Sequence, residues 1–285
     1  MTAGPRHRGR LAAGAVALTL TGLAGWYAVR TGAGPLPDPE QCNARVQGRT
    51  VTLDQEQAEN ASIIAGIGVT RGLPARAVSI ALATAYQESD IRNLDHGDRD
   101  SLGIFQQRPS QGWGTQAQVR DPYYASNAFY DVLAKIDGFQ TMRITEAAQR
   151  VQRSGYPEAY EPHAADARAL ASALTGYSSG GRFTCVVHAS NGKGTYSAAT
   201  RTLEKGFGPL DVAKRARQDF TVTVGDDPAG RRRGWAVAQF LTAHAATLKV
   251  TEVGFDGKRW RVGKESEQGW TSANTESGRV DVSLG

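Results

Sequence analysis

The sequence has few residues that bind metal ions, with only two cysteines and five histidines among its 285 residues. Two cysteines cannot complete a zinc site without other ligands, and neither His96 nor His163 shows a ligand spacing with them. We therefore expect no metal site. No part of the sequence implies a cofactor either.

Acidic residues are absent from the first 30 residues, which carry Arg6, Arg8, Arg10 and Arg30. These arginines account for most of the net charge of +5, so the rest of the chain is nearly neutral. A nucleic-acid-binding domain would need a basic face on its folded part. The remaining basic cluster, at 231–233, is expected to be a solvated helix entry, and we expect no nucleic-acid partner.

Long uncharged runs are missing except for one, from Leu11 to Val29. Its 19 residues are many for a signal-peptide core and just enough to cross a bilayer, which takes about 20 residues. The preceding arginines favour an N-terminus in the cytoplasm, and no clear Ala-x-Ala cleavage site follows. We interpret residues 1–30 as a signal anchor that contacts the membrane through residues 11–29, with a cleaved signal peptide as the alternative. The rest of the chain then belongs to the cell envelope, outside the cytoplasm, or is secreted.

The two cysteines, Cys42 and Cys185, both follow the uncharged run and would face an oxidising compartment. They bracket the central part of the chain. A bond between them would close a large loop, worth about 4–5 kcal/mol in the chain-entropy model. We predict this disulfide, with two unrelated thiols as the alternative.

Composition divides the chain after residue 30 into four parts, and helical periodicity predicts a mainly α fold. A Pro/Gly-rich linker at 31–48 precedes a helical domain at 49–177. A polar, glycine-rich connecting segment at 178–204 leads to a small α+β domain at 205–285, whose role the sequence does not reveal. Few core contacts should cross the connecting segment, so we expect the two domains to fold independently.

Five helices are expected in the central domain. A capping box at Thr52–Gln55 opens the first, which runs to about Val69, and the second begins near Pro74 and ends near Glu88. A loop rich in Asp, Gly and Gln follows. The other three helices begin near Asp121, Thr145 and Tyr160, and the last stops at Gly176.

The C-terminal part combines strand and helix patterns, and Trp235, Trp260 and Trp270 are expected to form its core. Its most specific signal is Asp256-Gly257, which is typical of a hairpin turn. The expected elements are helices at Leu210–Arg217 and Gly234–Leu248 and strands at Phe220–Val224, Val250–Phe255, Lys258–Val262, Trp270–Thr275 and Arg279–Leu284.

The residues with the clearest chemical meaning lie between Ala83 and Trp113. An apolar helix places Glu88 at its end, where partial desolvation would raise the pKa of the carboxyl and keep it protonated. Cleavage of a glycosidic bond needs such a proton donor. Downstream, Gly103 and Gln106 put a side-chain amide near a residue without Cβ, which suits close approach of a sugar. Trp113 could stack on a sugar face or could equally belong to the core.

The loop after Glu88 also contains Asp95, Asp98 and Asp100. An inverting hydrolase needs a second carboxylate to activate water, and Asp98 or Asp100 could supply it. The alternative, which we favour, is that these residues shape the loop through Asx turns.

Glu88-Ser89 followed by Gly103-Ile104-Phe105-Gln106 resembles the Glu-Ser and Gly-Leu-Met-Gln motifs of the lytic transglycosylase and goose-type lysozyme superfamily. The wider run from Gln87 to Pro109 is similar to an exported actinobacterial cell-wall branch. The resemblance covers roughly residues 50–176 and implies a lysozyme-like helical domain that acts on peptidoglycan glycan strands. It implies that Glu88 is the general acid and that Ser89 and Gln106 support the site and the substrate.

The sequence departs from the family at a third motif, which usually reads like Ala-Tyr-Asn-Ala-Gly. The corresponding stretch here runs from Ala148 to Tyr156. The resemblance implies that Gln152 takes the Asn position and that either Tyr156 or Tyr160 supplies the phenol.

Three functions are compatible with these patterns. A lytic transglycosylase would cleave between N-acetylmuramic acid and N-acetylglucosamine with one catalytic Glu. A muramidase-type hydrolase would cleave the same bond with an Asp of the following loop as its second carboxylate. A non-catalytic peptidoglycan-binding or scaffold protein would keep the fold alone, and the altered third motif favours that interpretation. The sequence identifies no protein partner and no oligomeric state.

Overall fold

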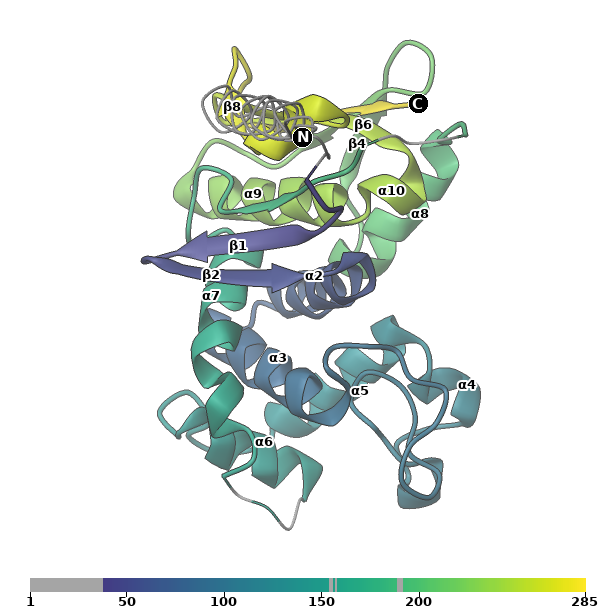
Figure 1. The fold of residues 1–285 in the computed structure, drawn as a ribbon, viewed down its shortest axis with the longest axis vertical. Coiled ribbons are helices and arrows are strands. Elements are labelled where there is room, and N and C mark those ends of the chain that lie inside the picture. The colour runs from purple at the N-terminus through teal and green to yellow at the C-terminus, as the bar shows by residue number, and fades with distance from the viewer. Residues whose placement is uncertain (1–37, 154–155, 157, 189–191) are drawn as a thin grey trace, which may run out of the picture. The chain divides into compact units, whose positions relative to one another are not determined.

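Two antiparallel sheets accompany the helices, so the fold is mixed α/β and the expectation of a mainly α chain is wrong (Figure 1). The computed structural model describes residues 38–153, 156, 158–188 and 192–285. The expected membrane or signal segment at 1–30 lies outside the described residues. Within them, no helix has the length and apolar character needed to cross a membrane. Residues 40–285 form one compact unit.

A three-stranded sheet begins in the segment that was expected to be a linker. Its strand order is β2 (Arg49–Leu53), β1 (Cys42–Val46) and β3 (Phe183–Cys185), all antiparallel. Gln47 and Gly48 form the turn between β1 and β2 with φ of 50° and 78°, as a tight hairpin requires. Periodicity missed β1 because its burial comes from pairing with a strand far along the chain.

The disulfide between Cys42 and Cys185 is confirmed. The two residues are direct partners across β1 and β3, with their Cα atoms 3.9 Å apart. Both side chains are fully buried, and the bond joins β1 to β3 within the small sheet.

The central helices follow the expected order. The first, α2 (Gln55–Thr70), is capped by Asp54 with Gln57, not by Thr52, which lies in β2 and donates to Asn43. Asp54 takes the cap because β2 extends to Leu53 and leaves only the next residue free to do so. The remaining helices are α3 (Ala75–Ser89), α4 (Gln116–Val119), α5 (Pro122–Leu133), α6 (Ile144–Gln152) and α7 (Ala164–Leu174), with 3₁₀ turns η1 (Pro109–Gln111) and η2 (Glu161–His163).

The expected connecting segment at 178–204 holds β3 and most of a helix, α8 (Tyr196–Phe207). Helix α9 (Pro228–Ala243) lies between the three-stranded sheet and the C-terminal sheet (Figure 1). It packs against α2, α7 and β3. The side chain of Gln239 on α9 is fully buried, accepts from the Phe183 amide and donates to the Ala173 carbonyl, each at 2.8 Å. The hydrophobic core is continuous across this boundary, which does not favour two independently folding domains.

The C-terminal sheet has the order β4-β5-β9-β6-β7-β8 and is antiparallel throughout. The hairpin at Asp256-Gly257 is confirmed, with φ of 48° and 74°. The helix expected at Leu210–Arg217 is wrong, because β4 (Asp211–Lys214) pairs with β5 as an edge strand. The remaining elements are β5 (Phe220–Thr223), α10 (Ala245–Leu248), β6 (Val250–Phe255), β7 (Lys258–Arg261), η3 (Lys264–Gln268), β8 (Thr271–Ser272) and β9 (Arg279–Leu284).

The three tryptophans of the C-terminal part are packed inward, as expected. Trp235 and Trp260 are buried, and Trp270 is partly buried against the core. The indole N–H of Trp260 donates to the Cys185 carbonyl and that of Trp270 to the Phe183 carbonyl, each at 2.9 Å. Trp260 and Trp270 therefore join the C-terminal part to β3 as well as packing in its core.

Candidate active site

Glu88 lies in the last turn of α3, and the backbone just beyond it is held in an uncommon conformation. Asp90 and Ile91 have φ of 54° and 59°, which is rare for a β-branched residue such as Ile91. The amide of Ile91 donates to the Ala85 carbonyl at 3.0 Å, and its carbonyl accepts from Asn60 of α2 at 2.8 Å. These contacts end the helix abruptly and fix where the Glu88 side chain emerges.

The carboxyl of Glu88 is partly desolvated. Burial raises its pKa above the ordinary value, and hydrogen bonds from Tyr160 and Gln152 oppose that rise without cancelling it. The Tyr160 hydroxyl donates to Oε1 at 2.8 Å. A carboxyl with a raised pKa that also has hydrogen-bond donors can hold a proton and still be stabilised after losing it.

Gln152 connects the candidate catalytic residue to the downstream motif. It is the last residue of α6, and its amide donates to the Phe105 carbonyl at 2.8 Å while also hydrogen-bonding to Glu88. The structure thus brings the end of α3, the 103–106 segment and α6 to one point.

A pocket of about 410 Å³ opens over Glu88. It brings together residues of α3, the 98–113 loop and the end of α6, far apart in the sequence. The lining includes six of the residues singled out from the sequence: Glu88, Asp98, Gln106, Trp113, Gln152 and Tyr156. Four further lining residues were not foreseen: Ser101, Arg108, Gln111 and Arg153.

Ser89 and Gly103 lie outside the lining of this pocket, and both act within the protein. The Ser89 hydroxyl donates to the Ile104 carbonyl at 2.8 Å and ties the motif to α3. Gly103 has a φ of 76°, and a Cβ there would lie 2.1 Å from the Val119 carbonyl oxygen. The close approach that requires this glycine is made by backbone, not by a sugar.

Gln106 lines the pocket but also holds the loop. Its amide nitrogen lies 3.3 Å from the His96 carbonyl and 3.2 Å from the Gly103 carbonyl. Its carbonyl oxygen packs so closely against Gly97 that a Cβ there would lie 1.9 Å away. Gln106 therefore positions the 96–103 loop over the pocket.

Asp98 and Asp100 occupy different environments. The Ser110 backbone amide and the Arg108 guanidinium lower the pKa of Asp100 to about 2, and the Ser110 hydroxyl adds a third contact. Asp100 is thus a loop-shaping residue, as favoured from the sequence. Asp98 lines the pocket with a highly exposed side chain, 4.0 Å from Arg99.

The phenol that donates to Glu88 belongs to Tyr160. Tyr160 is buried just before η2, whereas the Tyr156 side chain is 78% exposed and lines the pocket. The sequence left both tyrosines as candidates for this phenol, because the third motif departs from the family pattern and its spacing favours neither of them.

Trp113 lines two adjoining pockets. It is partly buried against the core and lines both the pocket over Glu88 and a second one of about 420 Å³. Gln111, Gln152 and Arg153 also line both. The two pockets therefore adjoin one another through these four shared residues.

The chain matches no protein-family model and no curated protein. Among the described residues, no group of three or more His, Cys, Asp or Glu side chains could hold a metal ion.

Proposed function

We propose that this protein cleaves peptidoglycan glycan strands between N-acetylmuramic acid and N-acetylglucosamine as a lytic transglycosylase. The observation that carries the proposal is the environment of Glu88: a carboxyl whose pKa burial raises, set in a polar pocket and contacted by Tyr160 and Gln152. Such a group supplies a proton at a glycosidic oxygen. The resemblance of its sequence motifs to transglycosylases points to the same bond.

In the proposed reaction, Glu88 protonates the leaving glycosidic oxygen as the bond to the muramyl anomeric carbon breaks. The substrate's N-acetyl group stabilises the resulting cationic centre. The Glu88 carboxylate then accepts the proton of the muramyl 6-hydroxyl, whose oxygen bonds to the anomeric carbon and closes a 1,6-anhydro ring. Tyr160 donates to the carboxylate between the two steps, so it stabilises the charged form that the first step creates.

The contacts of one of the two candidate carboxylates near Glu88 support this route over hydrolysis. Asp100 is held by Arg108 and Ser110 in the loop, so it is not free to activate water. Asp98 is the candidate base that is left, and it carries the alternative function of a muramidase-type hydrolase.

We further propose that the protein acts in the cell envelope. The disulfide between Cys42 and Cys185 is typical of an oxidising compartment. The arginine-flanked run at 11–29 supports export and contact with a membrane.

The decisive test is digestion of purified glycan strands followed by intact-mass analysis. Anhydro ends support the transglycosylase, reducing ends support the hydrolase, and no products support a non-catalytic binding protein. For the wild type we expect anhydro ends. The substitution Glu88→Gln keeps the shape of the side chain but cannot give up a proton, so the rate should fall by at least ~10²–10⁴-fold.

A matched control is Glu204→Gln, which makes the same change at an exposed position of α8. Its digestion rate should equal that of the wild type. Asp98→Asn should be milder than the Glu88 change. A fully active Glu88→Gln protein would refute the assignment.

A further inference from the structure

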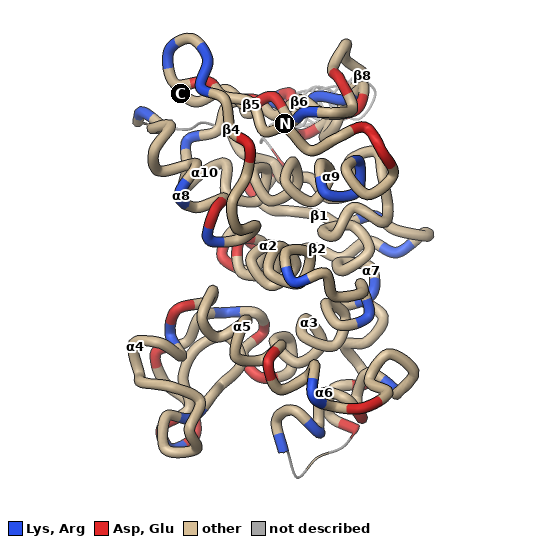
Figure 2. The backbone as a smooth tube through the Cα atoms, turned by 180° about the vertical axis from the view of Figure 1, so that it is seen from behind, with Lys and Arg blue, Asp and Glu red and all other residues tan. Residues whose placement is uncertain are grey.

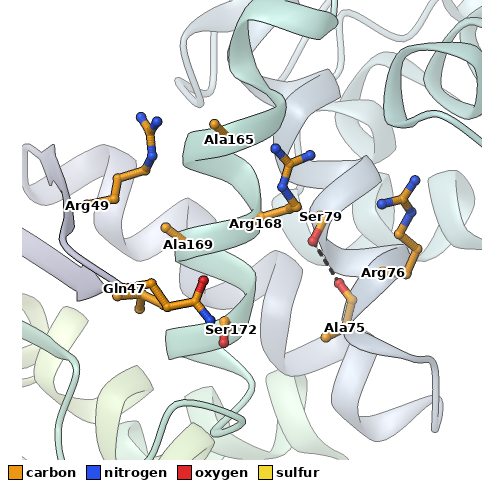
Figure 3. Close-up of a pocket in the computed structure, with 10 residues that line it drawn as sticks. Gln47, Arg49, Ala75, Arg76, Ser79, Ala165, Arg168, Ala169 and Ser172 are labelled. Atoms are coloured by element: carbon orange, nitrogen blue, oxygen red, sulfur yellow. Dashed lines mark hydrogen bonds between the residues drawn. The ribbon is translucent and has the colours of Figure 1, made fainter.

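A third pocket, of about 490 Å³, lies at the beginning of α3, away from Glu88 (Figure 3). The turn between β1 and β2, the first turns of α3 and one face of α7 line it. Three arginines are among the lining residues: Arg49, Arg76 and Arg168. None of the described residues that line the pocket is acidic.

The positive charge in this pocket is only partly neutralised. Arg49 pairs with Asp166 at 2.7 Å. In the part of the chain that the structure describes, neither Arg76 nor Arg168 forms an ion pair with a carboxylate. Arg76 donates through its terminal nitrogen to the Met142 carbonyl, and its buried Nε has no hydrogen-bond partner among those residues.

Outside the pocket, some described arginines are paired with a carboxylate and others, such as Arg201 and Arg259, are not. Charges of both signs are interspersed along the described backbone (Figure 2), and arginines such as Arg71, Arg92 and Arg143 each face a carboxylate. A buried Nε without a partner costs free energy that an added acceptor would recover. In Figure 3, Arg168 lies between Arg49 and Arg76, and the three guanidinium groups are spread from left to right across the view.

We propose that this pocket binds an oxyanion that carries at least two negative charges, as phosphate or carboxylate groups. The planar guanidinium group matches the oxygens of both in a two-pronged geometry. The Gln47 side chain, which also lines the pocket, adds an amide donor. The site lies at the opposite end of α3 from Glu88, about 20 Å along the helix axis. It does not depend on the proposed glycan cleavage.

Titration calorimetry on the purified full chain in neutral detergent tests this site. Pyrophosphate probes the phosphate source and citrate probes the carboxylate source, each at low and high salt. We expect saturable binding of one equivalent of at least one probe, weaker at high salt because ions screen the attraction. The tighter probe identifies which group the natural ligand carries.

Arg168→Gln removes an exposed arginine, so the fold should be kept, and it should weaken binding by at least ~10-fold. Arg168→Lys should recover only part of that loss, because an ammonium cannot make the two-pronged contact. The control Arg201→Gln removes the same charge from an exposed position of α8. It should bind like the wild type.

Two results would overturn the proposal. One is the absence of saturable binding for both probes, and the other is equal weakening by Arg168→Gln and Arg201→Gln, which would mean general charge attraction. Glu88→Gln should bind the probes normally. A chain that fails to cleave glycan can therefore still confirm this site.

Discussion

The hydrogen bond between Tyr160 and Glu88 leads to a specific prediction about the pKa of the Glu88 carboxyl. Burial raises the pKa of Glu88, and the Tyr160 hydroxyl, at 2.8 Å, opposes that rise. Tyr160→Phe keeps the buried ring but removes the donor. A hydrogen bond to a charged group contributes about 1.5–3 kcal/mol, here in favour of the carboxylate, so the pKa of Glu88 should rise further in the variant.

Carbon-13 NMR titration of the Glu88 carboxyl measures this directly. The midpoint should lie at higher pH in Tyr160→Phe than in the wild type. If Glu88 is the general acid, the alkaline limb of the rate profile on glycan strands should move the same way, because the acid stays protonated to higher pH.

Tyr130→Phe is the matched control. Its hydroxyl is buried and donates to the Ile64 carbonyl at 2.9 Å, so the variant also loses one buried phenol hydrogen bond. This hydroxyl is not among the groups that shift the pKa of Glu88, so the Glu88 midpoint should not change. An unchanged midpoint in Tyr160→Phe, or equal shifts in both variants, would refute the reasoning.

The raised pKa of Glu88 also predicts how the free energy of unfolding depends on pH. Burial raises the pKa of Glu88 in the folded chain above its ordinary value. The contribution of Glu88 to the free energy of unfolding is therefore fully present below its unfolded pKa, and it is lost as the pH rises through its folded pKa. The amide that replaces the carboxyl in the Glu88→Gln protein cannot ionise, so this variant should become the more stable one across that window. Urea unfolding of both proteins over a pH series checks the sign.

Two predictions concern the tie between the central and C-terminal parts. Reducing the Cys42–Cys185 bond, which closes a loop across 143 positions, should lower the free energy of unfolding by about 5 kcal/mol in the chain-entropy model. Urea unfolding with and without reductant measures it, and an unchanged midpoint would contradict the estimate. Gln239→Leu leaves the buried Phe183 amide of β3 unpaired, whereas the Ala173 carbonyl still accepts from the Gly176 amide, so the change should cost about 1–3 kcal/mol in the same assay. A loss below about 1 kcal/mol would mean that water replaces the amide.

Features set by neighbouring residues were predictable from the sequence. The apolar stripe of α3 predicted a helix that delivers Glu88 to a polar loop, and Asp256-Gly257 predicted the hairpin of β6 and β7. These patterns depend on helix period and turn geometry, which act within a few residues. The disulfide was also predictable, because only one pairing of Cys42 and Cys185 exists within the chain.

Features that depend on distant partners were decided by the tertiary structure. The strand at Cys42–Val46 exists because it pairs with β3, and Asp211–Lys214 is a strand because β5 lies beside it. Such pairing outweighs local propensity, which favoured a linker and a helix there.

The same distinction holds within the candidate site. The resemblance of the sequence motifs predicted that Glu88 and the 103–106 segment belong to one site, but the tertiary structure decided which phenol hydrogen-bonds to the carboxyl and which group lies against Gly103. Tyr160 reaches Glu88 because η2 and α7 bring it back to the end of α3. Gly103, in a turn, is required because the carbonyl of Val119 in α4 occupies the space that a Cβ would take. Neither contact has a signature in local sequence, since each is fixed by the packing of elements that the chain brings together only when folded.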